Sequence, residues 1–168
     1  ISDILEALLE EHIPLAVSIN TEKARSELII SNILVEIRRK FKRKISIFSG
    51  VELNVDKERE LSSFCDFIIS NSSEQLTLNA PVVAIVEAKN ENIIGGLGQC
   101  VAEMVAANIF NIQEKNPMER IYGAVTSGTA WQFLRLKGNE VEIDLKEYFI
   151  DNPGKSVGIL SSIVEQTA

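Results

Sequence analysis

The sequence predicts an α/β fold in which helices cover a mixed sheet. Apolar residues recur at helical spacing in some segments, and in others they alternate or run together as they do in strands. The expected order is a helix region, three strands, a helix and a strand, followed by a hairpin and a final helix. Strands and helices do not alternate strictly, which argues against a doubly wound parallel fold.

Helices are expected before the first strand. We expect Pro14 to end a short first helix and His12 to lie in the turn before it. A long amphipathic helix should begin at Thr21, a candidate N-cap, and end near Phe41. The expected apolar stripe of this helix is Leu28, Ile29, Ile33, Leu34 and Ile37. Its expected polar face carries Glu22, Arg25, Glu36 and Arg39.

The pattern then changes to that of strands. Apolar and polar residues alternate over 45–55, and a polar turn is expected over 56–60. A second strand is expected over 61–70, a loop over 71–79 and a third strand over 82–89. The third strand begins with five consecutive apolar residues, which is typical of a central strand covered on both faces.

The remaining elements follow Gly95, Gly96 and Gly98, which we expect to form a flexible entry to a helix over 99–114. The expected buried stripe of this helix is Val101, Met104, Val105, Ile109 and Ile112. A fourth strand over 120–126 and a hairpin of 131–137 with 140–145 should follow, with Trp131 and Phe133 in the core. Asn152 and Pro153 should begin a terminal helix that ends near residue 166.

Length, charge and composition exclude some classes of protein. The chain has 168 residues, which we expect to form one domain over 1–168, and a formal net charge of −7. This acidity argues against a surface coated with phosphate-binding cations. We expect no membrane span, because no run approaches about 20 apolar residues. Cys65 and Cys100 lie in apolar stretches without CxxC spacing, so we expect reduced thiols in a cytoplasmic protein.

The most informative residues lie at the end of the third strand. Glu87 and Lys89 should share one face of this strand, because residues two apart point the same way. Asp66 lies among apolar residues of the second strand, so neighbouring strands would bring Asp66 beside Glu87. Two close carboxylates favour a hard divalent cation, and Mg²⁺, with Mn²⁺ as the alternative, fits such oxygen ligands. The structural alternative is an ion pair in which Lys89 only neutralises Glu87.

Other acidic residues could complete this site. Glu27 on the long helix is the first candidate, although the helical phase leaves Glu22 open, and Glu52 on the first strand is a weaker candidate. Glu103 lies one turn after Gln99 and could either extend the site or be solvated.

A basic run lies at the end of the long helix. It consists of Arg38, Arg39, Lys40, Lys42, Arg43 and Lys44. It fits either a solvated helix C-terminus or a phosphate contact beside the cleft.

One pattern resembles the PD-(D/E)XK motif of restriction endonuclease-like nucleases: Asp66 is followed, after a gap of about twenty residues, by Glu87-Ala88-Lys89. The element order over 21–126 is similar to the αβββαβ core of that superfamily, to which this chain would add a C-terminal hairpin and helix. The resemblance implies that Asp66 and Glu87 bind the metal and that Lys89 orients water or stabilises charge on phosphorus. It further implies site roles for Glu27 and for Gln99 at the start of the following helix. Cys65 stands where the motif has proline.

The implied function is Mg²⁺-dependent hydrolysis of phosphodiester bonds, with DNA as the expected substrate of an endonuclease. The alternative is a catalytically silent nuclease-like module that binds nucleic acid or a protein partner in a larger assembly. Cleavage of both DNA strands by a domain with one site would suggest a homodimer.

Overall fold

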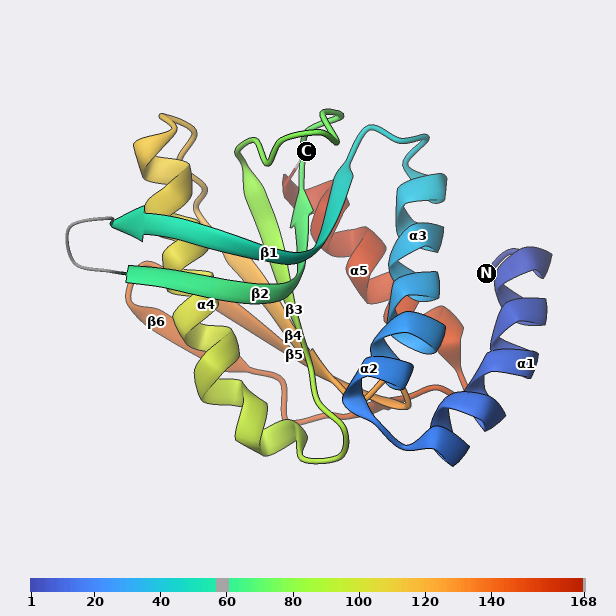
Figure 1. The fold of residues 1–168 in the computed structure, drawn as a ribbon. Helices are drawn as coiled ribbons and strands as arrows, with labels where there is room; N and C mark the ends of the chain where they lie inside the picture. The colour runs from blue at the N-terminus through green and yellow to red at the C-terminus, as the bar shows by residue number, and fades with distance from the viewer. Residues whose placement is uncertain (57–60, 168) are drawn as a thin grey trace.

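The computed structural model describes residues 1–56 and 61–167 and has the α/β architecture that the sequence predicts (Figure 1). Six strands lie side by side in the order β1–β2–β3–β4–β5–β6, and β7 pairs with β5 beside this path. Neighbouring strands are antiparallel except β3 and β4, which are parallel, so the sheet is mixed. The polar turn expected over 56–60 falls on 57–60, which lie outside the described residues.

The expected strands are present close to their predicted bounds. The strands are β1 (Ser46–Asp56), β2 (Leu61–Ser70), β3 (Val82–Ala88), β4 (Ile121–Thr126), β5 (Ala130–Lys137), β6 (Glu140–Ile143) and β7 (Tyr148–Phe149), the last of which the sequence did not predict. The helices are α1 (Asp3–Ile19), α2 (Glu22–Arg25), α3 (Ser31–Lys40), α4 (Ile93–Gln113) and α5 (Pro153–Thr167). A π-helical turn, η1 (Ser26–Ile30), joins α2 to α3.

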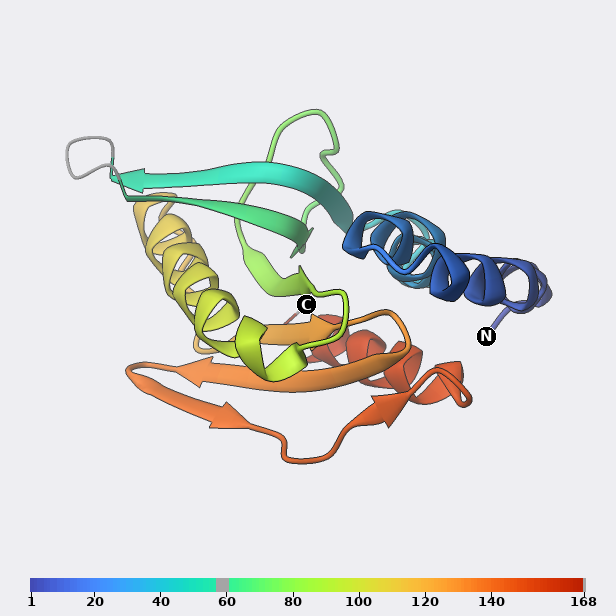
Figure 2. The same ribbon diagram turned by 60° about the horizontal axis from the view of Figure 1, so that its bottom comes forward.

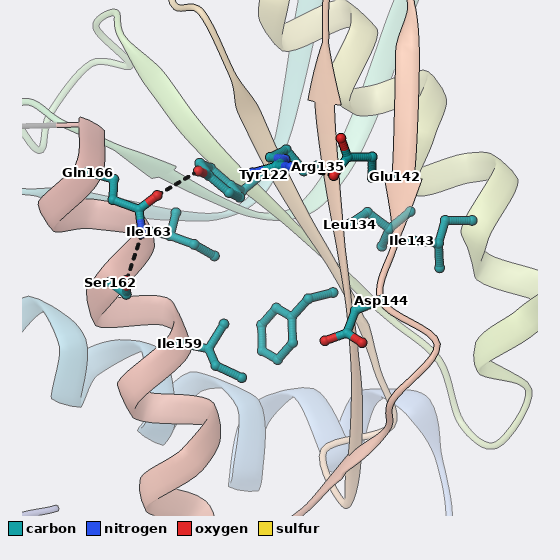
Figure 3. A pocket seen from close by; sticks show the side chains of 11 residues that line it. Tyr122, Leu134, Arg135, Glu142, Ile143, Asp144, Ile159, Ser162, Ile163 and Gln166 are labelled. Atoms are coloured by element: carbon teal, nitrogen blue, oxygen red, sulfur yellow. Dashed lines mark hydrogen bonds and ion pairs between the residues drawn. The ribbon is translucent and has the colours of Figure 1, made fainter.

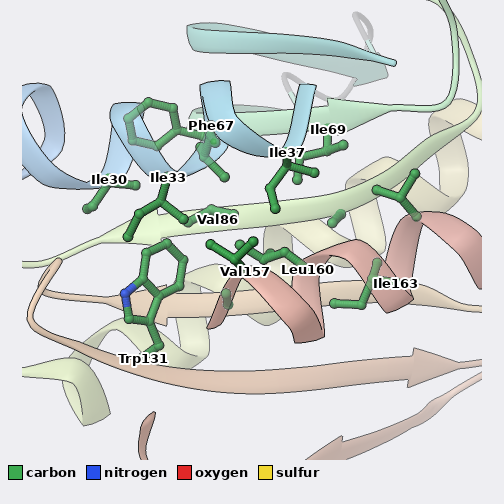
Figure 4. Close-up of a cluster of buried hydrophobic side chains, with 14 of the residues drawn as sticks. Ile30, Ile33, Ile37, Phe67, Ile69, Val86, Trp131, Val157, Leu160 and Ile163 are labelled. Carbon is green, nitrogen blue, oxygen red and sulfur yellow. The ribbon is translucent and has the colours of Figure 1, made fainter. Parts of the chain in front are cut away.

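Helices cover both faces of the twisted sheet (Figure 2). Helix α4 packs on β3 and β4 on one face, while α3 and α5 pack on the other and α1 packs against η1 and α3. Figure 4 shows how Ile33 of α3, Leu160 of α5 and Trp131 of β5 meet over β3. Trp131 and Phe133 are buried, as predicted, so their aromatic rings belong to the core. Strand β3 is buried along its whole length, which confirms that it is central.

Pro14 does not end helix α1, as the sequence predicted, but lies inside it, so the helix is longer than expected. The helix ends at Ile19, and Asn20 caps it with the left-handed φ of 53°. His12 therefore lies within the helix rather than in a turn. Its Nδ1 is 2.9 Å from Nδ2 of Asn32 and 3.2 Å from the carbonyl oxygen of Leu28, so it links α1 to the following helical stretch.

The long amphipathic helix is interrupted by η1. Thr21 caps it as predicted, its side chain accepting a hydrogen bond from the backbone N–H of Ala24. The π-turn closes i→i+5 hydrogen bonds, so the residues before it are rotated relative to a regular α-helix. This rotation turns Arg25 inward, and Arg25 is buried although the sequence placed it on the polar face. Glu36 is also buried, where it accepts hydrogen bonds from Ser2 and Arg39.

Helix α4 begins six residues earlier than predicted. Asn92 is its N-cap, so Gly95, Gly96 and Gly98 lie within the helix rather than in a flexible entry. Its buried side chains also differ from the predicted stripe. Val105 and Ile112 are exposed, whereas the residues facing the sheet include Gly96, Cys100, Glu103, Met104, Ala106, Ala107 and Asn111.

Close packing on the sheet explains this difference. A Cβ added to Gly123 of β4 would lie 2.5 Å from Sδ of Met104 and 2.9 Å from Sγ of Cys100. The helix therefore lies so near the strands that small residues are needed at the contact, and Val105 and Ile112 are exposed instead.

By length and composition alone, α4 is the single helix among the described residues that could cross a membrane, contrary to the expectation from the sequence. A buried core helix meets the same criteria. Helix α4 packs on β3 and β4 and turns the polar side chains of Glu103 and Asn111 toward the protein.

Candidate active site

The candidate site forms where β2 separates from β3. The antiparallel pairing of these strands ends at Phe67 and Val86, so Asp66 and Glu87 occupy the next positions on neighbouring strands. Oδ2 of Asp66 accepts a hydrogen bond of 2.9 Å from the backbone N–H of Ala88. The carboxylate thus takes the place of a strand partner, which explains why an aspartate is present within an apolar strand.

Strand β3 continues to pair with β4 beyond this point. Glu87 lies opposite Val125, and the backbone N–H of Lys89 donates to the carbonyl oxygen of Thr126 at 2.8 Å. The backbone that carries Glu87 and Lys89 is therefore held on the β4 side. On the β2 side the carboxylate of Asp66 holds the backbone N–H of Ala88, and the side chain of Lys89 contacts both Glu87 and Gln99 of α4.

A chain of hydrogen bonds runs from β3 to α4. Nζ of Lys89 donates to Oε1 of Glu87 and to Oε1 of Gln99, the latter at 3.3 Å. Nε2 of Gln99 donates to Oε1 of Glu103 at 3.1 Å. The structure thus brings Asp66, Glu87, Lys89 and Gln99 together, as expected, and adds Glu103, which the sequence left undecided. Gln99 lies in the second turn of α4, not at its start.

The carboxylates at this site are deeply buried. Glu87 is 1% exposed and Glu103 is 2% exposed. Oε2 of each carboxylate has no hydrogen-bond partner among the described residues. Burial raises the pKa of Glu87 to about 7, although the hydrogen bond from Lys89 acts in the opposite direction and the charge of Asp66 adds to the rise. Burial and the charge of Glu87 raise the pKa of Glu103 to about 8.

Lys89 is the cation of this cluster, and its side chain is 23% exposed. Burial alone would lower its pKa. The hydrogen bond and charge of Glu87, followed by the charges of Glu22 and Asp66, instead raise the pKa of Lys89 above its ordinary value. The ammonium therefore stays charged beside the carboxylates at neutral pH.

The donor set fits a small divalent cation. Unpaired buried carboxylate oxygens are costly, and an oxygen-seeking cation would satisfy them. Within residues 1–56 and 61–167 no three His, Cys, Asp or Glu side chains form a complete ligand group. Mg²⁺ needs only one or two protein carboxylates because it keeps several waters. Asp66 and Glu87 are the residues that would hold it.

The three other acidic candidates are placed differently. Glu27 is exposed and forms an ion pair of 2.7 Å with Lys23, one turn away on the same helix. Glu22 is also exposed, and its negative charge acts on Lys89. Glu52 is exposed on β1, opposite Phe64 of β2. Of these three residues, Glu22 is the one whose charge raises the pKa of Lys89.

The basic run lies further along the helical stretch from the candidate site than the sequence suggested, and a phosphate contact there stays a prediction. Arg25, at the start of the helical stretch, contacts Asn90 next to Lys89, whereas the run begins at Arg38. Thirteen residues of helix place Arg38 about 20 Å along the axis from Arg25. Figure 1 shows the end of α3 and the start of α2 at opposite ends of the molecule.

Arg25 is a residue of this region that the sequence did not reveal. Its guanidinium donates to Oδ1 of Asn90, to the carbonyl oxygen of Ser127, to Oγ1 of Thr129 and to Oδ1 of Asn20. These acceptors are neutral and lie in three separate loops or turns around the site. Arg25 therefore ties the segment after Lys89 to the β4–β5 turn and to the α1–α2 link.

The two cysteines are free thiols, as predicted, and both are buried near the carboxylates. Burial, followed by the charges of Glu103, Glu87 and Asp66, raises the pKa of Cys65 to about 12. Burial likewise raises the pKa of Cys100. Neither is a thiolate at neutral pH, so neither is a candidate nucleophile.

A separate hollow of about 400 Å³ lies between α5 and strands β4–β6 (Figure 3). Its polar groups bond to one another. Tyr122 donates to Gln166 at 3.0 Å, Gln166 donates to Ser162 at 2.8 Å, and Arg135 pairs with Glu142. None of the candidate site residues lines it.

Comparisons of the chain with protein-family models, with curated proteins and with solved structures found no match.

Proposed function

We propose that this protein is a divalent-metal-dependent phosphodiesterase that cleaves nucleic acid, with DNA as the expected substrate. One observation carries the proposal: Asp66, Glu87, Lys89 and Gln99 converge at the end of β3, and a buried oxygen of Glu87 lacks a partner. The order α3–β1–β2–β3–α4–β4 supports it, because restriction endonuclease-like nucleases have an αβββαβ core.

The residues of the chain have distinct roles in this proposal. Asp66 and Glu87 hold the cation, which when bound would polarise a phosphoryl oxygen and lower the pKa of a water molecule. Lys89 supplies a positive charge where negative charge builds up on the phosphoryl group. Gln99 accepts a hydrogen bond from the Lys89 ammonium and so fixes its direction. Glu103 holds the amide of Gln99 in the orientation that makes this contact possible.

Nucleic acid would be held over a longer surface than the site itself. The basic run of Arg38, Arg39, Lys40, Lys42, Arg43 and Lys44 lies about 20 Å along the helix axis from Arg25. Successive base pairs of DNA are about 3.4 Å apart, so a duplex of about six base pairs spans that distance. We expect contacts at the basic run to be weakened by salt, because they release counterions.

Cleavage of a supercoiled plasmid in the presence of Mg²⁺ or Mn²⁺ tests this function. We expect nicked or linear product with wild type, loss of cleavage on addition of a chelator and loss of at least about 100-fold in rate for Lys89→Ala. Lys155→Ala, an exposed lysine on α5, is the matched control and should cleave normally. Intact plasmid with wild type, or undiminished cleavage by Lys89→Ala, would falsify the catalytic assignment.

A measurement of Mn²⁺ binding distinguishes the proposed phosphodiesterase from a catalytically silent nuclease-like module. Asp66→Asn keeps an oxygen that can accept the hydrogen bond from Ala88, so the strands should remain in place while cation binding is lost. Calorimetric titration of wild type and Asp66→Asn measures this difference. Binding of DNA without cation binding or cleavage by wild type would instead favour the silent module.

A further inference from the structure

Strands β1 and β2 form a long antiparallel pair whose two halves face different parts of the core. In the half of β2 that pairs with β3, Phe67 and Ile69 belong to the buried cluster that α3 and α5 cover. Cys65 is two residues before Phe67, so regular alternation would place it on the same side. Cys65 instead belongs to the buried cluster that α4 covers. The face of β2 therefore reverses at Asp66.

Strand β1 reverses its face as well. Ile47 packs against the cluster that α3 covers. Val51 lies four residues further on, yet it packs against the cluster that α4 covers, and Leu53 is buried there too. Regular alternation would place all three residues on one side of the strand. Between Ile47 and Val51, Gly50 has a left-handed φ of +63°, which breaks the alternation.

Gly50 and Asp66 lie opposite each other in this strand pair. The residues on either side of them are paired across the strands, whereas Gly50 and Asp66 are not. Asp66 instead reaches β3, where its Oδ2 accepts the hydrogen bond of 2.9 Å from the N–H of Ala88. Both strands therefore reverse where the carboxylate of Asp66 leaves the pair and enters the candidate site.

We infer that Gly50 is a positioning residue of the candidate site. Its left-handed conformation reverses the strand pair opposite Asp66, and this reversal directs the carboxylate of Asp66 to the N–H of Ala88. The importance of this contact for holding a cation rests on the proposed function. The contact itself does not, so the two can be tested separately.

Conformation, rather than lack of space, accounts for the glycine. A Cβ added to Gly50 would meet only Cζ of Phe64 within 4 Å, at 3.6 Å, which is an ordinary contact. A left-handed φ is costly for alanine, whereas asparagine adopts it more readily because its side chain can hydrogen-bond locally. We therefore expect Gly50→Asn to keep the reversal and the smaller Gly50→Ala to weaken it. A lack of space would give the opposite order.

Hydrogen exchange of backbone amides, followed by NMR, tests this role without substrate or metal. The N–H of Ala88 donates to Asp66, whereas the N–H of Lys89 donates to Thr126 of β4 and serves as the internal reference. Gly50→Ala should raise the exchange rate of the Ala88 amide relative to that of Lys89 by about 5- to 30-fold, which corresponds to the usual cost of a left-handed alanine. Gly50→Asn should keep a ratio close to that of wild type.

Gly138 provides the matched control, because its φ of +57° is also left-handed and a Cβ there would meet nothing within 4 Å. It lies between β5 and β6, at the end of the sheet opposite Thr126. Gly138→Ala should therefore carry a similar strain and leave the ratio of Ala88 to Lys89 exchange unchanged. Asp66→Ala sets the upper limit of this ratio, since it removes the acceptor from the Ala88 amide.

An unchanged ratio in Gly50→Ala, or a Gly50→Asn variant that exchanges as fast as Gly50→Ala, overturns the positioning role. If Gly50→Ala does not fold, Gly50→Asn must still match wild type rather than Asp66→Ala.

Titration with Mn²⁺ measures the consequence for the site. Gly50→Ala should bind Mn²⁺ more weakly than Gly138→Ala, because the carboxylate of Asp66 is displaced in the first variant alone. Equal affinities of these two variants overturn the role of Gly50 in the site. A wild-type protein that binds no Mn²⁺ overturns the proposed function instead, and the exchange of the Ala88 amide still decides whether Gly50 positions Asp66.

Discussion

Arg25 joins separate parts of the candidate site without being part of its acidic cluster. It is 7% exposed, and its donors contact only neutral acceptors. A buried guanidinium is stable when its hydrogen bonds are satisfied, and each acceptor it contacts is satisfied in return. The position of Asn90, directly after Lys89, therefore depends on a residue more than sixty positions earlier in the chain.

Removal of Arg25 should destabilise the protein more than removal of a neighbouring exposed cation. Arg25→Met leaves the buried carbonyl oxygen of Ser127 and the half-buried acceptors of Asn90 and Thr129 without this donor, so we expect the free energy of unfolding to fall by roughly 2–4 kcal/mol. Arg25→Lys should lose less than Arg25→Met, because an ammonium keeps the charge but cannot reach all three loops or turns. Urea unfolding followed by circular dichroism measures the change. Lys23→Met, on the same helix and exposed, is the control, and an equal midpoint for Lys23→Met and Arg25→Met would contradict this prediction.

Two of the three glycines in the first turns of α4 differ in what surrounds them. A Cβ on Gly96 would lie 2.7 Å from Cγ1 of Val125 and 2.9 Å from Cε of Lys89, whereas a Cβ on Gly98 meets nothing within 4 Å. Gly96→Ala should therefore cost about 1–3 kcal/mol of stability and displace Lys89. Gly98→Ala should stabilise the helix by about 0.5–1 kcal/mol. Thermal unfolding compares the two, and equal effects would show that α4 is not held close to β3 and β4.

The strands and their order along the chain could be predicted because local patterns determine them. The apolar run of β3 and the alternation of β1 identify central and half-buried strands without knowledge of distant contacts. The same holds for the cluster of Asp66, Glu87 and Lys89. Two of these residues are separated by one position on a strand, and the third lies on the strand that precedes it.

Helix ends and helix faces could not be predicted as well, because long-range packing determines them. The π-turn over Ser26–Ile30 turns Arg25 inward, and nothing in the spacing of apolar residues indicates such a turn. Three glycines near the start of α4 locally disfavour a helix. One of them, Gly96, is needed because α4 lies so close to Val125 of β4 that a larger residue would not fit. Glu103 is likewise polar in sequence but faces the sheet in the fold.

The acidic and basic residues of the molecule are distributed unevenly. The charge of Asp66 raises the pKa of Glu87, and the charges of Glu87 and Asp66 raise that of Glu103, whereas the cations of the basic run lie at the far end of α3. The folded protein thus keeps mutually repelling carboxylates in a buried place, which costs stability unless protons or a cation are bound. The net charge of −7 would therefore not argue against a nucleic-acid substrate if a divalent cation were bound at this site, as proposed.

Stability should decrease as the pH rises through the range in which the buried carboxylates ionise. Burial raises the pKa of Glu87 to about 7 and that of Glu103 to about 8, from an ordinary value of 4.5. Between about pH 4.5 and pH 8 the folded protein binds more protons than the unfolded chain, so the free energy of unfolding falls as the pH increases. The loss is on the order of 3 kcal/mol for Glu87 alone.

Urea unfolding across this pH range, with and without Mn²⁺, measures the dependence. Mn²⁺ should reduce the loss at high pH, because a bound cation favours the ionised carboxylates. Glu103→Gln removes one of the two ionisations, so its stability should change less with pH than that of wild type. Glu165→Gln, exposed on α5, is the matched control and should follow wild type. A Glu103→Gln variant with the pH dependence of wild type would show that Glu103 is already ionised in the folded protein at low pH, and that its burial does not oppose its charge.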